Sequence, residues 1–167
     1  MGSAQVQSQV WGVQTRNWAD LMEKKKLPIY HVVFDKTNVG RGTRLLDVGC
    51  GTGMAAQLAA QLGAHVTGLD ASEAELVIAR ERVPNGDFRC GDMEELPYAD
   101  TSFDVVTGFN SFQFADNPLH ALWEARRVVK PGAYVAMVAW GPPSRYANWP
   151  SMISCLRLKP SRVCLHK

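Results

Sequence analysis

The chain has 167 residues, enough for one domain with a substantial core, and its 46% apolar and 20% charged residues are typical of a soluble globular protein. Residues 141–167 hold five basic and no acidic side chains, so the remainder is mildly acidic, which argues against a nucleic-acid-binding groove. No apolar run approaches the roughly 18 residues of a membrane span. The four cysteines (Cys50, Cys90, Cys155 and Cys164) lack metal-ligand spacing, so we expect free thiols, no metal and a cytoplasmic location.

Strand and helix patterns alternate along most of the chain. Residues 1–40 predict a helical N-terminal lead that caps the main domain, 41–140. The expected strands cover 44–49, 65–70, 87–92, part of 97–110, and 133–140. The expected helices cover 54–63, 72–83 and 117–129. Their boundaries carry helix signals: Gly63 as a C-terminal cap, Ser72 with Glu75 as a capping box, and Pro118 in a first turn.

This alternation predicts an α/β domain with a doubly wound, mainly parallel sheet and helices on both faces. In such sheets ligands bind outside the carboxyl ends of the strands, at the switch point in strand order. We therefore search for functional residues directly after each predicted strand.

The acid-free tail, residues 141–167, differs in composition from the domain before it. Its 27 residues are too few for a further helix and two long strands. Two possibilities remain, a small hairpin and a weakly ordered tail, and we favour the weakly ordered tail. The fifth strand would then be an exposed sheet edge, open to homodimer formation. Residues 150–167 should accordingly be removable without unfolding the domain.

A glycine-rich turn, "DVGCGTGM", follows the first predicted strand. Its spacing is GxGxG, and Met54 stands where a dinucleotide-binding fingerprint has its third glycine. Asp47 lies two residues before the first glycine, where a carboxylate would repel a pyrophosphate but attract a ligand bearing ammonium and sulfonium groups. The turn therefore favours a cationic nucleoside cofactor over NAD.

Four motifs in order, "LLDVGCGTG", "GLD", "CGDMEELPYADTSFDVV" and "RVVKPGAYV", make residues 40–140 resemble a class I S-adenosylmethionine-dependent methyltransferase. The resemblance is strongest to the ubiquinone and menaquinone C-methylases, which act on small molecules. It implies a Rossmann-like fold, and the short C-terminus implies that most of the family's closing antiparallel strand pair is lacking.

The resemblance also implies a set of cofactor-binding positions, all in the glycine turn or at strand ends. They are Asp47, Gly49, Cys50, Gly51, Gly53, Asp70, Ala71, Asp92, Met93, Phe109 and Asn110. The turn would adjoin the methionine part of the cofactor, and Asp70 would accept the ribose hydroxyls. Asp92 and Met93 would contact the adenine beside a small residue 71, and Phe109 and Asn110 would hold the amino-acid end. Either aspartate alone could instead only cap the segment that follows it.

The reaction implied is in-line methyl transfer to a small-molecule acceptor, with S-adenosylhomocysteine as product. No residue predicts a general base, because Asn110, Ser111 and Gln113 near the expected transfer point are not bases. The stretch "FNSFQF" differs from the motif of amino-group methylases, so nucleic-acid-base and peptide-amide methylation are disfavoured. Two alternatives stay open: a truncated or non-catalytic binding module of the same fold, and an NAD-dependent oxidoreductase.

Overall fold

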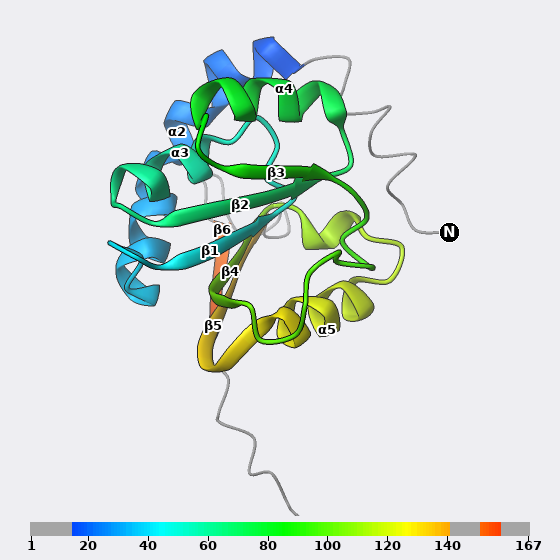
Figure 1. Cartoon of the computed structure of the whole chain (residues 1–167). Coiled ribbons are helices and arrows are strands. Elements are labelled where there is room, and N and C mark those ends of the chain that lie inside the picture. The colour runs from blue at the N-terminus through cyan, green and yellow to red at the C-terminus, as the bar shows by residue number, and fades with distance from the viewer. Residues whose placement is uncertain (1–14, 141–150, 158–167) are drawn as a thin grey trace, which may run out of the picture.

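A single mixed sheet of six strands forms the centre of the molecule (Figure 1). The computed structural model describes residues 15–140 and 151–157, with the side chains of 26–139 and of Arg157. The strands are β1 (Arg44–Val48), β2 (His65–Asp70), β3 (Asp87–Cys90), β4 (Phe103–Phe109), β5 (Val129–Trp140) and β6 (Ser151–Arg157). Their order is β3-β2-β1-β4-β5-β6, with β1 to β5 parallel and β6 antiparallel.

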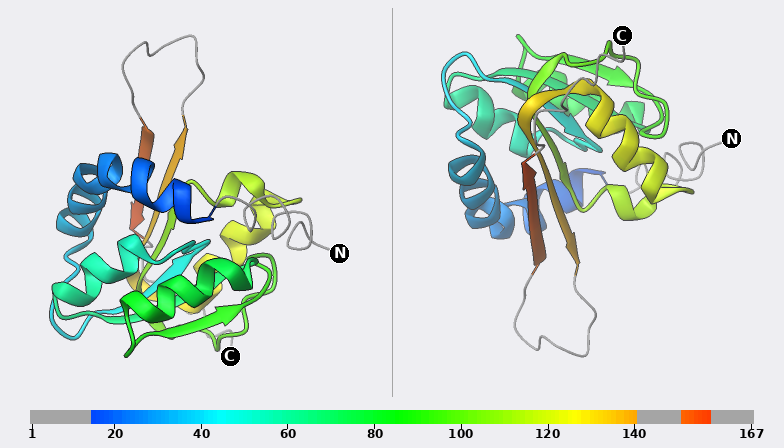
Figure 2. Two further views of the ribbon diagram at one scale, coloured as in Figure 1. Left: turned by 90° about the horizontal axis from the view of Figure 1, so that it is seen from above. Right: turned by 90° about the horizontal axis from the view of Figure 1, so that it is seen from below.

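Helices cover both faces of this sheet, as Figures 1 and 2 show. They are α2 (Thr15–Thr37), α3 (Met54–Gln61), α4 (Glu73–Arg82), the short 3-10 helix η1 (Phe112–Phe114) and α5 (Pro118–Val128). The first three pack on one face, and η1 and α5 pack on the other. The predicted doubly wound α/β architecture is confirmed. No helix among these described elements combines the length and apolar character that crossing a membrane requires.

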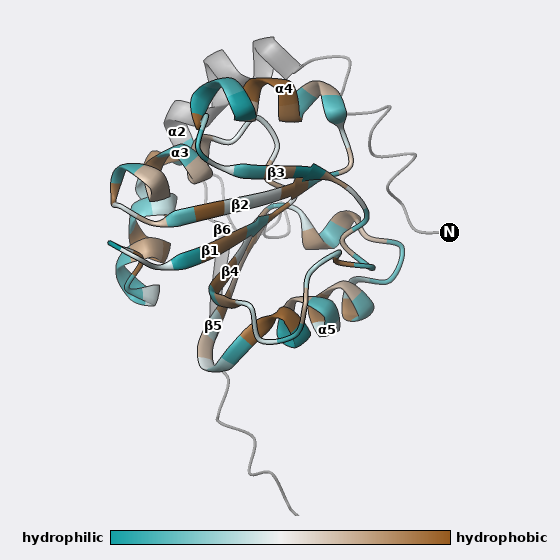
Figure 3. Ribbon diagram, viewed as in Figure 1, coloured by the Kyte–Doolittle hydropathy of each residue, from teal (hydrophilic) through white to brown (hydrophobic). Residues whose placement is uncertain are grey.

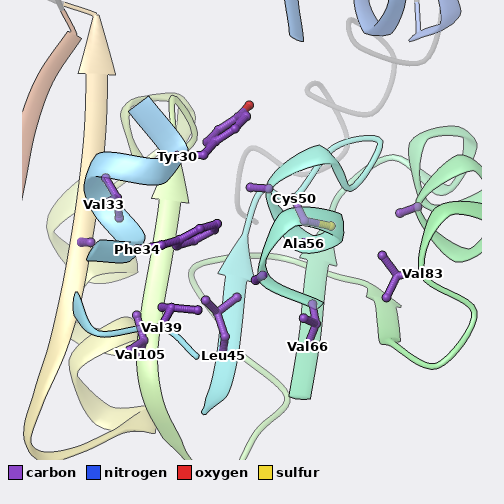
Figure 4. Close-up of a cluster of buried hydrophobic side chains, with 14 of the residues drawn as sticks. Tyr30, Val33, Phe34, Val39, Leu45, Cys50, Ala56, Val66, Val83 and Val105 are labelled. Atoms are coloured by element: carbon purple, nitrogen blue, oxygen red, sulfur yellow. The ribbon is translucent and has the colours of Figure 1, made fainter. Parts of the chain in front are cut away.

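Alternation along β1 divides the core into two layers. Leu45 points to the layer shared with α2, α3 and α4, whereas Leu46 and Val48 point to the layer shared with α5. All three side chains are fully buried. Figure 3 shows brown, hydrophobic segments along the central strands, interrupted by hydrophilic ones. Figure 4 shows the first layer, in which Phe34 of α2 lies over the strands. The sheet is thus covered by one packed hydrophobic layer on each face.

The C-terminal strand corrects two expectations from the sequence. β6 pairs with β5 from Trp140↔Ser151 to Tyr134↔Arg157, so Ser151–Arg157 is a strand within the segment expected to be weakly ordered. The Arg157 Nε donates to Gly132 O at 3.2 Å, and the guanidinium lies 5.6 Å from the Tyr134 ring centroid. The homodimer predicted through an exposed fifth-strand edge is therefore wrong in its premise, because β6 covers that edge. The rest of the expected tail, 141–150 and 158–167, lies outside the described residues.

Two local predictions also differ from the structure. Ser72 is the N-cap of α4, but its hydroxyl makes no capping bond. The amide N–H of Ser72, which a capping-box glutamate would bind, donates to Asp70 Oδ1 at 2.9 Å instead. β5 begins at Val129 rather than 133, because the residues after α5 already lie against the start of β4, with a register irregularity between Phe103 and Val105.

Candidate cofactor-binding site

The predicted site residues lie together along one edge of the sheet. β3, β2, β1 and β4 are neighbours and parallel, so their carboxyl ends meet there. Asp47 and the glycine turn belong to the end of β1, and Asp70 and Ala71 to the end of β2. Asp92 and Met93 follow β3, and Phe109 and Asn110 end and follow β4. Residues that are far apart in the sequence therefore lie side by side at the ends of four neighbouring strands.

The glycine turn is fixed to the end of β2 by three hydrogen bonds that its backbone amides donate. The amides of Gly49 and Cys50 donate to Leu69 O at 2.7 and 3.1 Å, and the amide of Gly51 donates to Asp70 Oδ2 at 2.8 Å. Cys50 is buried against the first core layer and is a free thiol. The turn is therefore a preformed backbone surface rather than a loop that must fold around a ligand.

Glycine is required at the first and last positions of the turn, because both have a left-handed backbone and each lies close to a different neighbouring residue. Both have left-handed φ angles, 69° at Gly49 and 80° at Gly53. A Cβ on Gly49 would lie 2.3 Å from the Cβ of Ser111, so the turn touches the segment after β4. A Cβ on Gly53 would lie 2.9 Å from the Cβ of Ala79, so Gly53 permits close packing of α3 on α4. Gly53 thus permits close packing between two helices, whereas the third glycine of a dinucleotide fingerprint permits close packing of a helix on a strand.

Asp70 links the turn to α4 through both of its carboxylate oxygens. Besides the bond from Gly51, Oδ1 accepts the amide of Ser72 at 2.9 Å. Burial raises the pKa of Asp70, and these amide bonds oppose the rise. The Ala71 amide is a third donor to Asp70, and because an ionised carboxylate has about four lone-pair sites, capacity remains for at least one ligand hydroxyl. The local capping contact and the ribose role are therefore compatible.

Asp47 lies deeper than the sequence suggests. Its side chain is 2% exposed and accepts a hydrogen bond from Thr107 Oγ1 at 2.8 Å across the β1–β4 ladder. Burial raises the pKa of Asp47 to about 7, the Thr107 bond opposes that rise, and the charge of Asp70 adds to it. A buried carboxyl group there would act on a bound cation through its field. Sequence reasoning missed Thr107 because strand register is not visible in the sequence.

The residues after β3 form a turn beside Ala71. Asp92 Oδ1 accepts the amide of Glu94 at 2.9 Å, a local bond of the kind that aspartates make in turns. Met93 is half-buried against the second core layer. Cys90 is exposed, and its Sγ lies 3.5 Å from Ala71 O, so the ends of β2 and β3 are adjacent. This arrangement has a small residue and a carboxylate where the adenine is expected.

At the end of β4, Phe109 meets aromatic side chains from α2. Tyr30 and Phe34, which Figure 4 labels, contact the Phe109 ring edge-on, with centroids 4.7 and 6.1 Å away. Tyr30 is 5% exposed, so the N-terminal helix covers this end of the sheet. Sequence reasoning placed α2 outside the site, because nothing local in "LPIYHVVF" shows which strand end its aromatic residues contact.

Buried polar atoms at the carboxyl edge of the sheet fit a polar ligand. Asn110 Oδ1 and Ser111 Oγ are buried and have no hydrogen-bond partner among the described residues, and the same holds for Ser72 Oγ beside Asp70. Buried polar groups are nearly always paired, so such atoms on both sides of the glycine turn indicate a ligand that supplies the partners. These atoms suit the hydroxyl and amino-acid groups of S-adenosylmethionine.

An open depression of about 640 Å³ lies at the opposite, amino-terminal edge of the strands. Arg44, His65 and Asp87 line it at the starts of β1, β2 and β3, together with Arg82 of α4. It contains none of the predicted site residues. We assign the ligand site to the carboxyl edge because ligands of open parallel sheets bind there and because the unpartnered polar atoms beside the glycine turn are there.

Comparison with known proteins agrees with this geometry. Residues 46–137 match the family described as a methyltransferase domain, and the chain belongs to that family, as a class I S-adenosylmethionine-dependent methyltransferase domain. A demethylmenaquinone methyltransferase of Renibacterium salmoninarum is 36% identical over 131 residues, 78% of this chain and 51% of the relative. A ubiquinone biosynthesis O-methyltransferase of Hahella chejuensis is 42% identical over 97 residues, 55% of this chain and 41% of the relative.

A solved structure of an S-adenosylmethionine-dependent methyltransferase from Aquifex aeolicus shares the fold, with a TM-score of 0.61 and 26% identity. The similarity covers 68% of this chain and 69% of that one. The chain spans about half the length of the curated relatives that it matches.

Proposed function

We propose that this protein transfers a methyl group from S-adenosylmethionine to a small-molecule acceptor. Family membership supports the reaction class, and one observation supports the cofactor most directly: Asp70 is held in place by the Gly51 and Ser72 amides at the side of the glycine turn. In our proposal this carboxylate accepts the ribose hydroxyls of the cofactor, beside the backbone of the glycine turn. A cytoplasmic location stays a prediction from the sequence.

When bound, the cofactor supplies a methyl group already activated on a sulfonium, so the chain needs mainly to bind, orient and exclude water. In our proposal Asp70 accepts the ribose hydroxyls, Asp92 and Met93 contact the adenine, and Asn110 holds the amino-acid end. Tyr30, packed on Phe109, keeps water from the end of β4. No general base is assigned, which suits an acceptor that binds as an anion, having lost its proton to solvent before the transfer.

For the acceptor we propose a quinone-type ring compound. The relatives are named for demethylmenaquinone and ubiquinone biosynthesis. Phe109 is half-buried at the strand end where transfer is expected, and aromatic rings pair favourably with such a side chain. Only small-molecule acceptors are proposed; nucleic acid is disfavoured by the mildly acidic domain.

Calorimetric titration with S-adenosylhomocysteine, with NADH as the control ligand, tests the cofactor. Micromolar binding of the first and none of the second is expected. An acceptor screen with S-adenosylmethionine then separates a methyltransferase from a module that binds without turnover. Binding of NADH alone would reinstate the oxidoreductase alternative.

Replacing Asp70 by alanine should weaken S-adenosylhomocysteine binding at least about tenfold, because each hydrogen bond to a charged group contributes roughly 1.5–3 kcal/mol. The matched control is Asp104→Ala at the start of β4. Asp104 accepts bonds from Arg44 N and Lys130 Nζ, far from the carboxyl edge, so its removal should leave the affinity unchanged. Equal affinities of the Asp70→Ala and native proteins would contradict the ribose assignment.

A further inference from the structure

The β3–β4 loop, residues 91–102, contains no helix or strand, and α5 holds it at several points. Arg127 of α5 donates to Leu96 O at 2.9 Å and to Tyr98 O at 2.8 Å. Glu124, one turn earlier, accepts the Leu96 amide at 2.9 Å and binds the Arg127 guanidinium through both carboxylate oxygens at 2.7 Å. Irregular backbone needs hydrogen-bond partners, and here two charged side chains of one helix supply them.

Glu94 ties the same loop to the start of α5. Its Oε1 accepts the amide of Asp116 at 2.8 Å and that of Asn117 at 3.2 Å, directly before the helix. The amide of Glu94 in turn donates to Asp92 Oδ1 at 2.9 Å. A single residue therefore connects the beginning of α5 to the carboxylate of Asp92.

The residues assigned to the adenine lie between two anchored points. On one side the Gly91 amide donates to Asp70 O at 3.0 Å, at the end of β2. On the other side lies Glu94. Asp92 and Met93 are half-buried, so they lack the close packing that fixes side chains in a core. Their placement relative to β2 therefore depends on the hydrogen bonds at Gly91 and Glu94.

We propose that Glu94 and Arg127 are positioning residues for adenine selectivity, an inference that rests on the proposed function. In the proposed site Asp92 accepts a hydrogen bond from the adenine amino group. Hydrogen bonds weaken steeply when their angle departs far from a straight line, so the selectivity requires a fixed Asp92 side chain. Glu94 fixes that side chain directly, and Arg127 fixes the loop that carries it. Neither residue was singled out from the sequence, because their partners lie 22 and 31 residues away.

The test compares S-adenosylhomocysteine with S-inosylhomocysteine, in which an oxygen replaces the adenine amino group. The native protein should bind the first at least about tenfold more tightly, because only adenine donates to the Asp92 carboxylate. In Glu94→Ala this preference should fall to about threefold or less, through weaker binding of S-adenosylhomocysteine, because the Asp92 side chain is no longer held in line. Glu94→Gln should keep the native preference, because its side-chain oxygen still accepts the two amides.

Arg127→Met is the second variant, and it should lose the preference in the same way. The matched control is Lys130→Met at the start of β5. Lys130 Nζ pairs with Asp104 Oδ1 at 2.6 Å, so this variant also loses an ion pair, but one outside the β3–β4 loop. Its preference should equal that of the native protein.

An equal weakening of both ligands in Glu94→Ala, or an unchanged preference, would overturn the inference, because the anchor would then only stabilise the fold. Loss of the preference in Glu94→Gln as well would also contradict it. A native protein that binds both ligands equally would overturn the adenine assignment and this inference with it. If the native protein binds neither, the proposed function itself fails.

Discussion

At the scale of single residues, two glycines separate the cost of backbone strain from the cost of overpacking. Gly53 and Gly132 both have φ near 80°, but a Cβ on Gly132 would meet nothing within 4 Å, whereas one on Gly53 would meet Ala79 at 2.9 Å. We expect Gly132→Ala to lower the free energy of unfolding by about 1 kcal/mol from backbone strain alone. Gly53→Ala should cost about 1–3 kcal/mol more from overpacking of α3 on α4. Chemical denaturation of both variants measures the difference, and equal losses would show that α4 shifts freely.

Asp47 makes a separate prediction about pH. Its folded-state pKa of about 7 lies above the ordinary value of 3.8, so the folded protein binds the proton more tightly than the unfolded chain. The contribution of Asp47 to stability is therefore fully present below pH 3.8 and is lost as pH rises to about 7. Asp47→Asn keeps an oxygen for Thr107 to bond and removes this loss. At pH 8 the variant should be more stable by up to about 4 kcal/mol, and near pH 4 it should differ little.

Denaturation of both proteins between pH 4 and pH 8.5 measures the effect. The native protein also contains Asp70, whose pKa burial raises, and the variant retains that contribution. A difference between the two proteins that does not change with pH would show that Asp47 is ionised throughout the range.

The sequence predicted which residues stand at the strand ends but not which residues they meet. Asp47, Asp70 and Asn110 are recognisable because each directly follows or ends an apolar run. The partners Thr107 and Ser111 depend on the register of β1 against β4 and on the closeness of the turn to η1. Such contacts join segments about sixty residues apart and leave no local pattern.

At the scale of elements, β6 is the largest difference between expectation and structure. It was not predicted because the tail is too short for a helix and two long strands. A single strand, however, is enough to pair with β5. The other elements repeat local patterns: Pro118 begins α5 as predicted, with the Asn117 side chain accepting the His120 amide at 3.1 Å. Long-range pairing is thus the part of this fold that local patterns do not encode.

Removing residues 151–167 should therefore destabilise the domain, contrary to the expectation from the sequence. The truncated chain would expose the hydrogen-bonding edge of β5, which invites pairing between chains. We expect a lower melting temperature and concentration-dependent association on a sizing column. Removing only 158–167 is the control, because it leaves β6 intact. A monomeric truncated chain with unchanged melting would show that β6 adds little to the sheet.

At the scale of the whole molecule, the site lies where the direction of chain progression reverses. From β1 the chain moves outward through β2 and β3, then returns to the other side of β1 as β4. The glycine turn and Ser111 meet across this switch point, where crevices for ligands form in open α/β sheets. All cofactor contacts expected from the sequence fall between Asp47 and Asn110, within the residues that match the methyltransferase family.

The same strand order has a consequence for synthesis of the protein. Each strand after β1 joins an edge that already exists, first through β2 and β3 on one side and then through β4, β5 and β6 on the other. No strand has to be inserted between two earlier ones, so the sheet can grow outward while the chain leaves the ribosome. The bare edge of β5 persists only until residue 157 has emerged, and that interval is when a nascent chain is most exposed to pairing with its neighbours.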